Sequence, residues 1–259
     1  MSQKSKDEEA AEVVASEKII VPEHPRHKGV YLLPNLFTTS ALFSGFYAII
    51  ASINGEFTLS AIAIFVAMVL DTLDGRVARM TGTQSDFGAE YDSLSDVIAF
   101  GLAPALVAFL WSLNEIGKIG WICSFIYVAG TALRLARFNT QLDTADKRFF
   151  TGIPSPAAAA VVASFVWMAT EWGFVGDELA IYFAIIVASV GLLMVSNVRF
   201  YSFKVVAHRK KVSFMAVVFG VFVIALVAID PATVIFAVAS LYLFSGPVYE
   251  LWLRIKRRR

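Results

Sequence analysis

Long apolar runs separated by short polar breaks restrict the fold of this 259-residue chain more than any other feature. A helix needs about 20 mostly apolar residues to cross the hydrocarbon core of a bilayer. Composition agrees, because only 17% of the residues are charged, against about 25% in water-soluble domains. The sequence therefore predicts an all-α, polytopic bundle of about eight transmembrane helices. The predicted spans are Leu33–Ile53, Phe57–Ala78, Ser93–Leu113, Ile119–Phe138, Pro156–Glu171, Leu179–Val198, Phe214–Ile229 and Pro231–Leu251.

The positively charged residues are concentrated on one side of this predicted bundle. Of the 22 lysines and arginines, only Lys118 falls in a loop opposite the termini. Short loops rich in lysine and arginine stay in the cytoplasm. We therefore predict that both termini face the cytoplasm, across the inner membrane if the organism is a bacterium. The basic runs at helix ends suit anchoring at anionic lipid headgroups, and we expect no nucleic-acid partner.

Four aspartates stand near the ends of two neighbouring apolar segments, where charge is costly. Asp71 and Asp74 follow an almost purely apolar stretch and are three residues apart, which places them on one helix face. Asp92 and Asp96, four residues apart in the next segment, also share a face. An ionised side chain in hydrocarbon costs about 3 kcal/mol even on the most lenient scale. We therefore expect these carboxylates to be compensated by cations.

The type of side chain indicates the kind of ion. Carboxylates without a neighbouring Cys or His suit Mg²⁺ or Mn²⁺ rather than zinc, and four of them suggest two divalent cations. Helix capping, or pairing with Arg76 and Arg79, is a weaker explanation. Asp71 and Asp74 lie toward a helix C-terminus, where the helix dipole disfavours anions. A cation transporter or channel is an alternative reading of buried acids, although all four lie near one membrane face.

The spacing of the four aspartates and their small and basic neighbours matches a known pattern. It reads Asp71-x-x-Asp74-Gly75-x-x-Ala78-Arg79, then eight residues, then Gly88-x-x-x-Asp92-x-x-x-Asp96. In every one of these positions the sequence resembles the CDP-alcohol phosphotransferases. The resemblance implies a six-helix core with a two-metal site at the cytoplasmic end of its second and third helices. It also implies cleavage of the pyrophosphate of a CDP-activated lipid.

The resemblance assigns a role to each aspartate. Asp71, Asp74 and Asp92 would hold the metal ions, and Asp96 would join the second ion and act as the base for the incoming hydroxyl. Two cations would neutralise the charge that builds on the leaving CMP, and a carboxylate near the alcohol would accept its proton. No nucleophilic residue is needed, so we expect direct in-line displacement without a covalent enzyme intermediate.

The same resemblance predicts the residues that contact the CDP-lipid. Helix packing is an alternative explanation for the small residues among them, and helix capping is an alternative for Asn35 and Thr38, which lie at the start of the first span. The predicted set is Asn35, Thr38, Gly75, Ala78, Arg79, Ser85 and Gly88.

A second, narrower resemblance concerns the acceptor alcohol. The segments at 131–139 and 149–160, which contain Arg134 and Arg137, are similar to the phosphatidylserine synthase branch of the family. This implies transfer of the phosphatidyl group of CDP-diacylglycerol to L-serine, giving phosphatidylserine and CMP. Two arginines on one helix face could receive a carboxylate or a phosphate, so glycerol 3-phosphate and an inositol phosphate remain alternative acceptors. Anchoring at the cytoplasmic interface is a competing explanation for Arg137.

These observations divide the chain into three parts. We predict a flexible polar cytoplasmic arm at 1–28, a transmembrane catalytic domain at 29–253 and a basic cytoplasmic tail at 254–259. The expected partners are CDP-diacylglycerol, L-serine and membrane lipids. Because transferases of this kind are often dimers, we also expect a homodimer.

Overall fold

The computed structural model describes residues 32–140, 149–201 and 214–257, and these are almost entirely helical. Each predicted apolar segment coincides with helix, and a two-stranded sheet joins two of the connections. The elements are α2 (Leu32–Ile53), α3 (Phe57–Thr81), α4 (Asp86–Asp96), the π-helical turn η1 (Val97–Leu102), α5 (Ala103–Trp111), the 3₁₀ turn η2 (Leu113–Ile116), α6 (Lys118–Thr140), β1 (Phe149–Thr151), α7 (Ser155–Glu171), α8 (Gly176–Val195), β2 (Arg199–Tyr201), α9 (Phe214–Ile229) and α10 (Pro231–Arg257).

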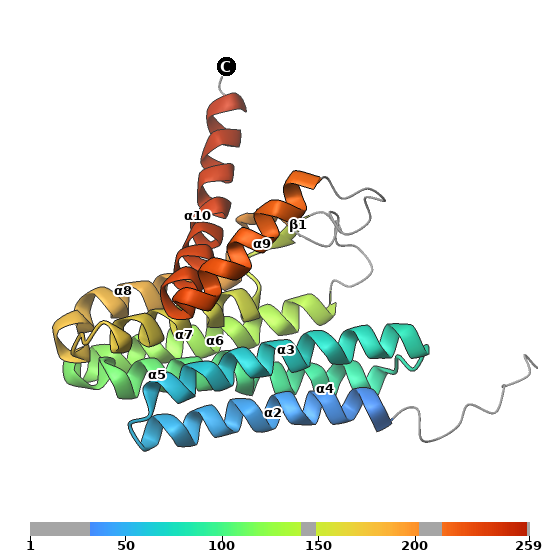
Figure 1. Ribbon diagram of the computed structural model, residues 1–259, viewed down its shortest axis with the longest axis horizontal. Coiled ribbons are helices and arrows are strands. Elements are labelled where there is room, and N and C mark those ends of the chain that lie inside the picture. The colour runs from blue at the N-terminus through green and yellow to red at the C-terminus, as the bar shows by residue number, and fades with distance from the viewer. Residues whose placement is uncertain (1–31, 141–148, 202–213, 258–259) are drawn as a thin grey trace, which may run out of the picture.

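Helices α2 to α8 lie side by side in a bundle, while α9 and α10 are inclined to it (Figure 1). Six apolar stretches in the described residues are long enough to cross a membrane, and α4, η1 and α5 together form one of them, Asp86–Trp111. Two of the eight predicted spans correspond to shorter helices, α7 with 17 residues and α9 with 16. The fold is thus the expected all-α bundle of a multi-pass membrane protein, with six helices of clear spanning length.

The connection between α3 and α4 is short, and its residues cap the end of one helix and the start of the next. Helix α3 ends at Gly82, which adopts the left-handed conformation (φ 62°) and donates its N–H to the Ala78 carbonyl, a conformation that favours glycine. Helix α4 begins after Ser85, whose hydroxyl accepts the Gly88 N–H at 3.1 Å, as N-cap residues do. The two helices that carry the aspartates therefore meet at one end of the bundle.

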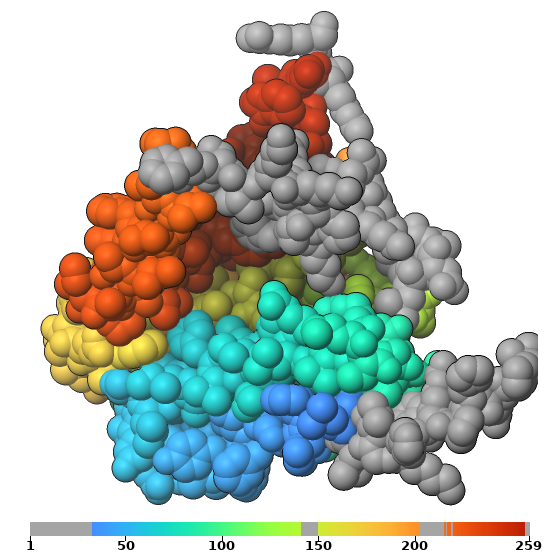
Figure 2. Space-filling model, turned by 45° about the vertical axis from the view of Figure 1, so that its right-hand side comes forward, coloured from blue at the N-terminus to red at the C-terminus, as the bar shows by residue number. Residues whose placement is uncertain are grey.

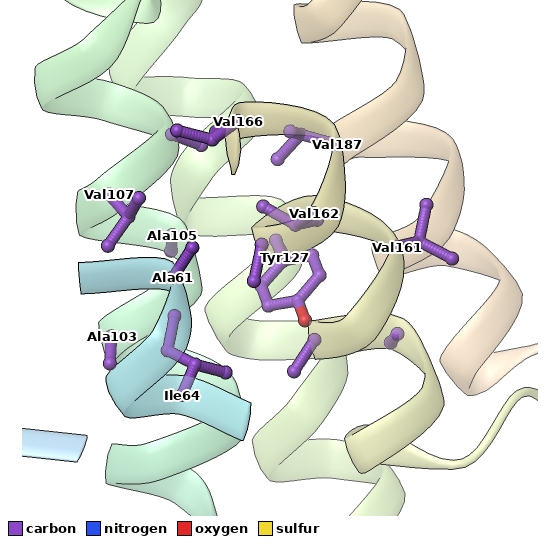
Figure 3. Packing of buried hydrophobic residues seen from close by; sticks show 14 of the residues in the cluster. Ala61, Ile64, Ala103, Ala105, Val107, Tyr127, Val161, Val162, Val166 and Val187 are labelled. Atoms are coloured by element: carbon purple, nitrogen blue, oxygen red, sulfur yellow. The ribbon is translucent and has the colours of Figure 1, made fainter. Parts of the chain in front are cut away.

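The bundle core is built mainly from small and β-branched side chains, with a few large ones (Figure 3). Tyr127, Ile64 and Val162 are completely buried at its centre. Small residues allow helices in a membrane to approach closely. One such approach joins α6 and α8, where a Cβ atom on Gly130 would collide with the backbone of Gly191.

The two strands link the connections that precede α7 and follow α8. They pair antiparallel, with Phe150 opposite Phe200. The Phe200 side chain is buried, and its ring lies against Gly246 of α10. Helix α10 packs on α7 through its first half and leaves many of its later side chains exposed.

The predicted terminal segments are described only in part. The arm at 1–28 lies outside the described residues. Helix α10 continues through Arg257, so residues 254–257 of the predicted basic tail extend that helix. In Figure 2 the N-terminal helices, blue to teal, form the lower part of the molecule, and the red end of α10 projects at the top.

Candidate functional site

The predicted site residues come from several helices, and their positions on those helices bring them to one end of the bundle. This end is formed by the N-termini of α2, α4 and α7 and by the C-termini of α3, α6 and α8 (Figure 1). Alternating helix direction explains the arrangement, because each helix that reaches this end is followed by one that leaves it. The fold therefore gathers polar side chains that are up to about 100 residues apart in the chain, as is common for sites between the helices of a bundle.

Three of the four aspartates form a compact cluster. Each of Asp71, Asp74 and Asp92 offers a carboxylate oxygen, and these oxygens all lie within 4.8 Å of one another. Asp74 is buried and the other two are half-buried. Among the described residues, the Asp92 Oδ1 atom is buried without a hydrogen-bond partner, and a buried polar atom in that state points to a bound ion or water. Oxygen donors at this spacing could hold a hard divalent cation.

The fourth aspartate, Asp96, lies one helical turn further along α4. Its carboxyl group is not one of the three oxygens that converge, but it interacts with the carboxyl group of Asp71. It is also close enough to the guanidinium of Arg134 from α6 for their opposite charges to interact. Asp96 thus interacts both with the aspartate cluster and with an arginine.

Helix α2 supports the cluster through a residue that the sequence predicts for lipid binding. The Thr38 hydroxyl donates to Asp74 Oδ2 at 2.7 Å. The Thr38 carbonyl in turn accepts from the Ser95 hydroxyl at 3.2 Å. These bonds tie α2, α3 and α4 together, and the first of them orients one carboxylate of the cluster. Thr38 therefore lies beside the predicted metal ligands.

The two glycines of the predicted CDP-lipid site, Gly75 and Gly88, do not lie where two helix backbones touch. The three atoms nearest to a Cβ added at Gly75 would all belong to the guanidinium of Arg79, at 3.4 Å or more. A Cβ on Gly88 would meet only the Ser85 hydroxyl, at 3.2 Å, and Asn35 Oδ1, at 3.6 Å. Both glycines therefore adjoin polar side chains of the predicted set rather than a neighbouring backbone. Ala78, one turn from Gly75 and next to Arg79, is half-buried.

The two predicted acceptor-binding arginines point to different partners. Arg134 Nη1 donates to the Ser155 hydroxyl at 2.9 Å, and its Nε is buried without a hydrogen-bond partner among the described residues. Arg137 Nη1 donates to the Val195 carbonyl at 3.0 Å, at the C-terminus of α8. An arginine that binds a terminal carbonyl stabilises the helix end. Arg134 therefore has a buried donor that no described residue accepts.

Several site neighbours were not among the predicted site residues, although Asn139 and Ser155 lie in the segments similar to the synthase branch. Ser155 begins α7 and binds Arg134, while Tyr242 of α10 is near enough to Arg134 for an electrostatic interaction. Asn139 lies within the segment similar to the synthase branch, and its amide donates to the Ser93 hydroxyl of α4 at 3.1 Å. Serine, asparagine and tyrosine are common at helix ends, so only their spatial neighbours identify them.

Comparison with known proteins places these residues in context. A CDP-alcohol phosphatidyltransferase family model matches residues 31–195, which span α2 to α8. A CDP-diacylglycerol–serine O-phosphatidyltransferase of Helicobacter pylori (strain ATCC 700392 / 26695) is 39% identical over 227 residues, covering 88% of this chain and 94% of the relative. The enzyme of the same name from Mycobacterium leprae is 32% identical, covering 68% of this chain and 60% of the relative. An archaetidylserine synthase of Methanothermobacter thermautotrophicus is 36% identical, covering 65% and 69%.

Proposed function

This chain belongs to the CDP-alcohol phosphatidyltransferase family, and from that premise we propose that it transfers the phosphatidyl group of CDP-diacylglycerol to the hydroxyl of L-serine. The products are phosphatidylserine and CMP. Relatives that carry the name of this activity, and that align over most of the chain, support serine as the acceptor. The observation that carries the proposal is that Asp96 interacts both with Asp71 of the aspartate cluster and with Arg134.

The aspartate cluster provides the donor half of the reaction. Asp71, Asp74 and Asp92 supply hard oxygen ligands at a suitable spacing, and the unpartnered Asp92 Oδ1 suits coordination of a cation. We propose two divalent ions, Mg²⁺ or Mn²⁺, with Asp96 as a ligand of the second. Bound there, they would neutralise charge on the pyrophosphate and on the departing CMP.

The residues around the cluster would hold the donor lipid. Arg79 is exposed at the end of α3 and adjoins Gly75, so its guanidinium is available to a phosphate group. Asn35 and Ser85 border Gly88 at the start of α4. A glycine on each of two helices thus stands beside polar side chains that could contact a nucleotide. We propose that this set, with Ala78 and Thr38 beside it, contacts CDP-diacylglycerol.

Asp96 and Arg134 provide the acceptor half. We propose that the Asp96 carboxylate accepts the proton of the serine hydroxyl as the new bond to phosphorus forms. The unpartnered Nε of Arg134 suits the serine carboxylate. Arg137 supports this region from the next turn of α6 and holds the end of α8. Attack is direct, so the lipid is never attached to the enzyme.

We also propose a location for the site in the cell. Arg76, Arg79 and Arg137 lie at the site end of their helices, whereas Lys118 begins α6 at the opposite end. This asymmetry supports a cytoplasmic active site, in the inner membrane of a bacterium. A homodimer is proposed on the family resemblance alone.

A CMP-release assay tests the proposed reaction. Purified protein in detergent receives CDP-diacylglycerol and Mg²⁺ or Mn²⁺, with L-serine, glycerol 3-phosphate, inositol phosphate or no acceptor in parallel. We expect serine-dependent release that chelation abolishes and that Asp96→Asn lowers by roughly a hundredfold or more. CMP release with only one of the other acceptors would show that this alcohol, and not serine, is the acceptor. No release with any acceptor would contradict a transferase and favour cation transport.

A further inference from the structure

A π-helical turn begins at the residue that follows Asp96. The span Asp86–Trp111 is continuous, but η1 (Val97–Leu102) has the wider π-helical geometry, with the Ala103 N–H donating to the Ile98 carbonyl five residues earlier. Such turns are rare and occur frequently at functional sites. A π-turn changes the rotation of one helical segment relative to the next. The direction in which Asp96 projects therefore depends on how η1 is held.

A tyrosine of another helix completes the hydrogen bonding of this turn. Pro104 lies four residues after Phe100 and has no N–H, so an α-helical bond to the Phe100 carbonyl cannot form there. The hydroxyl of Tyr127, on α6, donates to this carbonyl at 3.1 Å. Tyr127 is completely buried, and a buried carbonyl needs a donor. The bond is thus a specific connection between α6 and η1.

Close packing holds η1 on two sides. A Cβ on Gly101 would lie 3.1 Å from the Thr131 side chain of α6. A Cβ on Gly45 of α2 would lie 2.6 Å from the backbone of Ala99. The turn therefore lies between α2 and α6 without space to shift toward either.

The contacts of α6 with η1 and with the acceptor site come from one helix face. Tyr127, Thr131 and Arg134 follow one another at spacings of four and three, which aligns them along the same side of α6. The first two contact Phe100 and Gly101 of η1. The third faces Asp96. The same helix thus holds the turn that carries Asp96 and presents the arginine opposite it.

We propose that Tyr127 is a positioning residue for the transfer reaction. Through its bond to the Phe100 carbonyl it sets the rotation of α4 at Asp96, and so the distance between the proposed base and the acceptor-binding Arg134. The inference rests on the proposed transferase function. It goes beyond that function because Tyr127 lies within the apolar core, outside the sets of residues proposed to contact the lipid and serine.

A Tyr127→Phe variant tests the proposal, with Ser124→Ala as its matched control. Ser124 is buried on the same helix and also uses its hydroxyl to donate to a backbone carbonyl, that of Gly120 at 3.1 Å, but this bond stays within α6. We expect Tyr127→Phe to lower the kcat of serine-dependent CMP release by roughly ten- to a hundredfold, with the KM for CDP-diacylglycerol unchanged. Ser124→Ala should keep the wild-type kcat. Both variants should lower the melting temperature to a similar extent.

A second substitution separates positioning from stability. Pro104→Ala returns an N–H that can donate to the Phe100 carbonyl in an α-helical register. In the double variant Tyr127→Phe/Pro104→Ala we expect the melting temperature to recover while kcat stays low, because the carbonyl is satisfied but the turn is no longer held by α6. Recovery of kcat together with the melting temperature would overturn the proposal, as would an equal kcat for Tyr127→Phe and the wild type. An inactive wild type would instead refute the proposed function.

Discussion

At the scale of single residues, the site combines the proposed metal ligands with side chains that contact them. Asp74 is a buried carboxylate with a short hydrogen bond from Thr38, 36 residues earlier in the chain. Partners of this kind fix the orientation of a metal ligand, and their loss commonly lowers metal affinity by about 10- to 100-fold. Thr38 is therefore as much a part of the cluster as the aspartates.

Thr38→Val should weaken metal binding without unfolding the protein. We expect the Kd for Mn²⁺, measured by isothermal titration calorimetry, to rise by about tenfold. Ser44→Ala is the matched control, since the Ser44 hydroxyl also bridges α2 and α3, by donating to the Ala63 carbonyl at 2.8 Å, without meeting a carboxylate. Thr38→Ser should restore affinity. Equal affinities for Thr38→Val and the control would show that the hydrogen bond does not orient Asp74.

The two arginines of α6 should respond differently to substitution. Arg134→Lys removes the planar donor set that suits a carboxylate, and we expect the KM for serine to rise by about tenfold or more with the KM for CDP-diacylglycerol unchanged. Arg137→Lys should leave the KM for serine near the wild-type value and lower the melting temperature, because Arg137 holds the last turn of α8. Steady-state kinetics with each substrate varied in turn would check this. A larger KM effect from Arg137→Lys would make that residue the main acceptor contact.

At the scale of elements, glycines have three different uses in this bundle. Gly130 of α6 and Gly191 of α8 allow two helices to touch at the backbone. Gly75 and Gly88 adjoin polar side chains at the site. A Cβ added at Gly220 of α9 would have no neighbouring atom within 4 Å in the described part of the chain. The same residue type in an apolar helix therefore marks a close packing contact, a position beside polar side chains or neither.

Substitutions at Gly130 and Gly220 should separate packing from helix propensity. Gly130→Ala forces α6 and α8 apart, and overpacking of this kind costs about 1–3 kcal/mol. Gly220→Ala adds a methyl group where space is open. We expect the free energy of unfolding to rise by up to about 1 kcal/mol, because alanine has the higher helix propensity. Thermal unfolding in detergent would measure both. A neutral Gly130→Ala would mean that the two helices can separate at little cost.

At the scale of the whole molecule, the helices α2 to α8 of the family match form the bundle and carry most of the site. The match ends at residue 195, the end of α8. Helices α9 and α10 lie beyond it, and α10 returns to the site by way of Tyr242. Phe200 of β2 anchors it, with its ring against Gly246 and 5.7 Å from the Tyr242 ring. Helix α10 thus approaches Arg134, the proposed acceptor-binding residue.

The proposed orientation can be measured on the intact membrane. With Cys123, the single cysteine, replaced by serine, a new cysteine is placed at Gln84 in the site-end turn or at Asn114 in the opposite turn, both exposed. A membrane-impermeant maleimide should label Asn114→Cys from outside the cell, and Gln84→Cys only in inverted vesicles. Labelling in the reverse pattern would place the active site on the outer face.

The sequence was sufficient to predict several features of the molecule. Apolar runs located the long helices, because hydrophobic length decides whether a segment can span a bilayer. The spacing of Asp71, Asp74, Asp92 and Asp96 put two carboxylates on one face of each of two helices. Short connections then bring consecutive helix ends together, and the carboxylates of Asp71, Asp74 and Asp92 converge, whereas the predicted metal site also included Asp96.

Other features depend on how each helix is rotated and which helix it contacts. The bonds from Thr38 to Asp74 and from Tyr127 to the Phe100 carbonyl, and the different partners of Arg134 and Arg137, follow from that packing. In a membrane a helix can be apolar on every side, so its sequence has little amphipathic pattern to show which face turns inward. The chain alone therefore determines its helices and the kind of chemistry at their ends. Only the tertiary structure decides which side chains hold those groups in place, because close packing of small residues selects the helix faces.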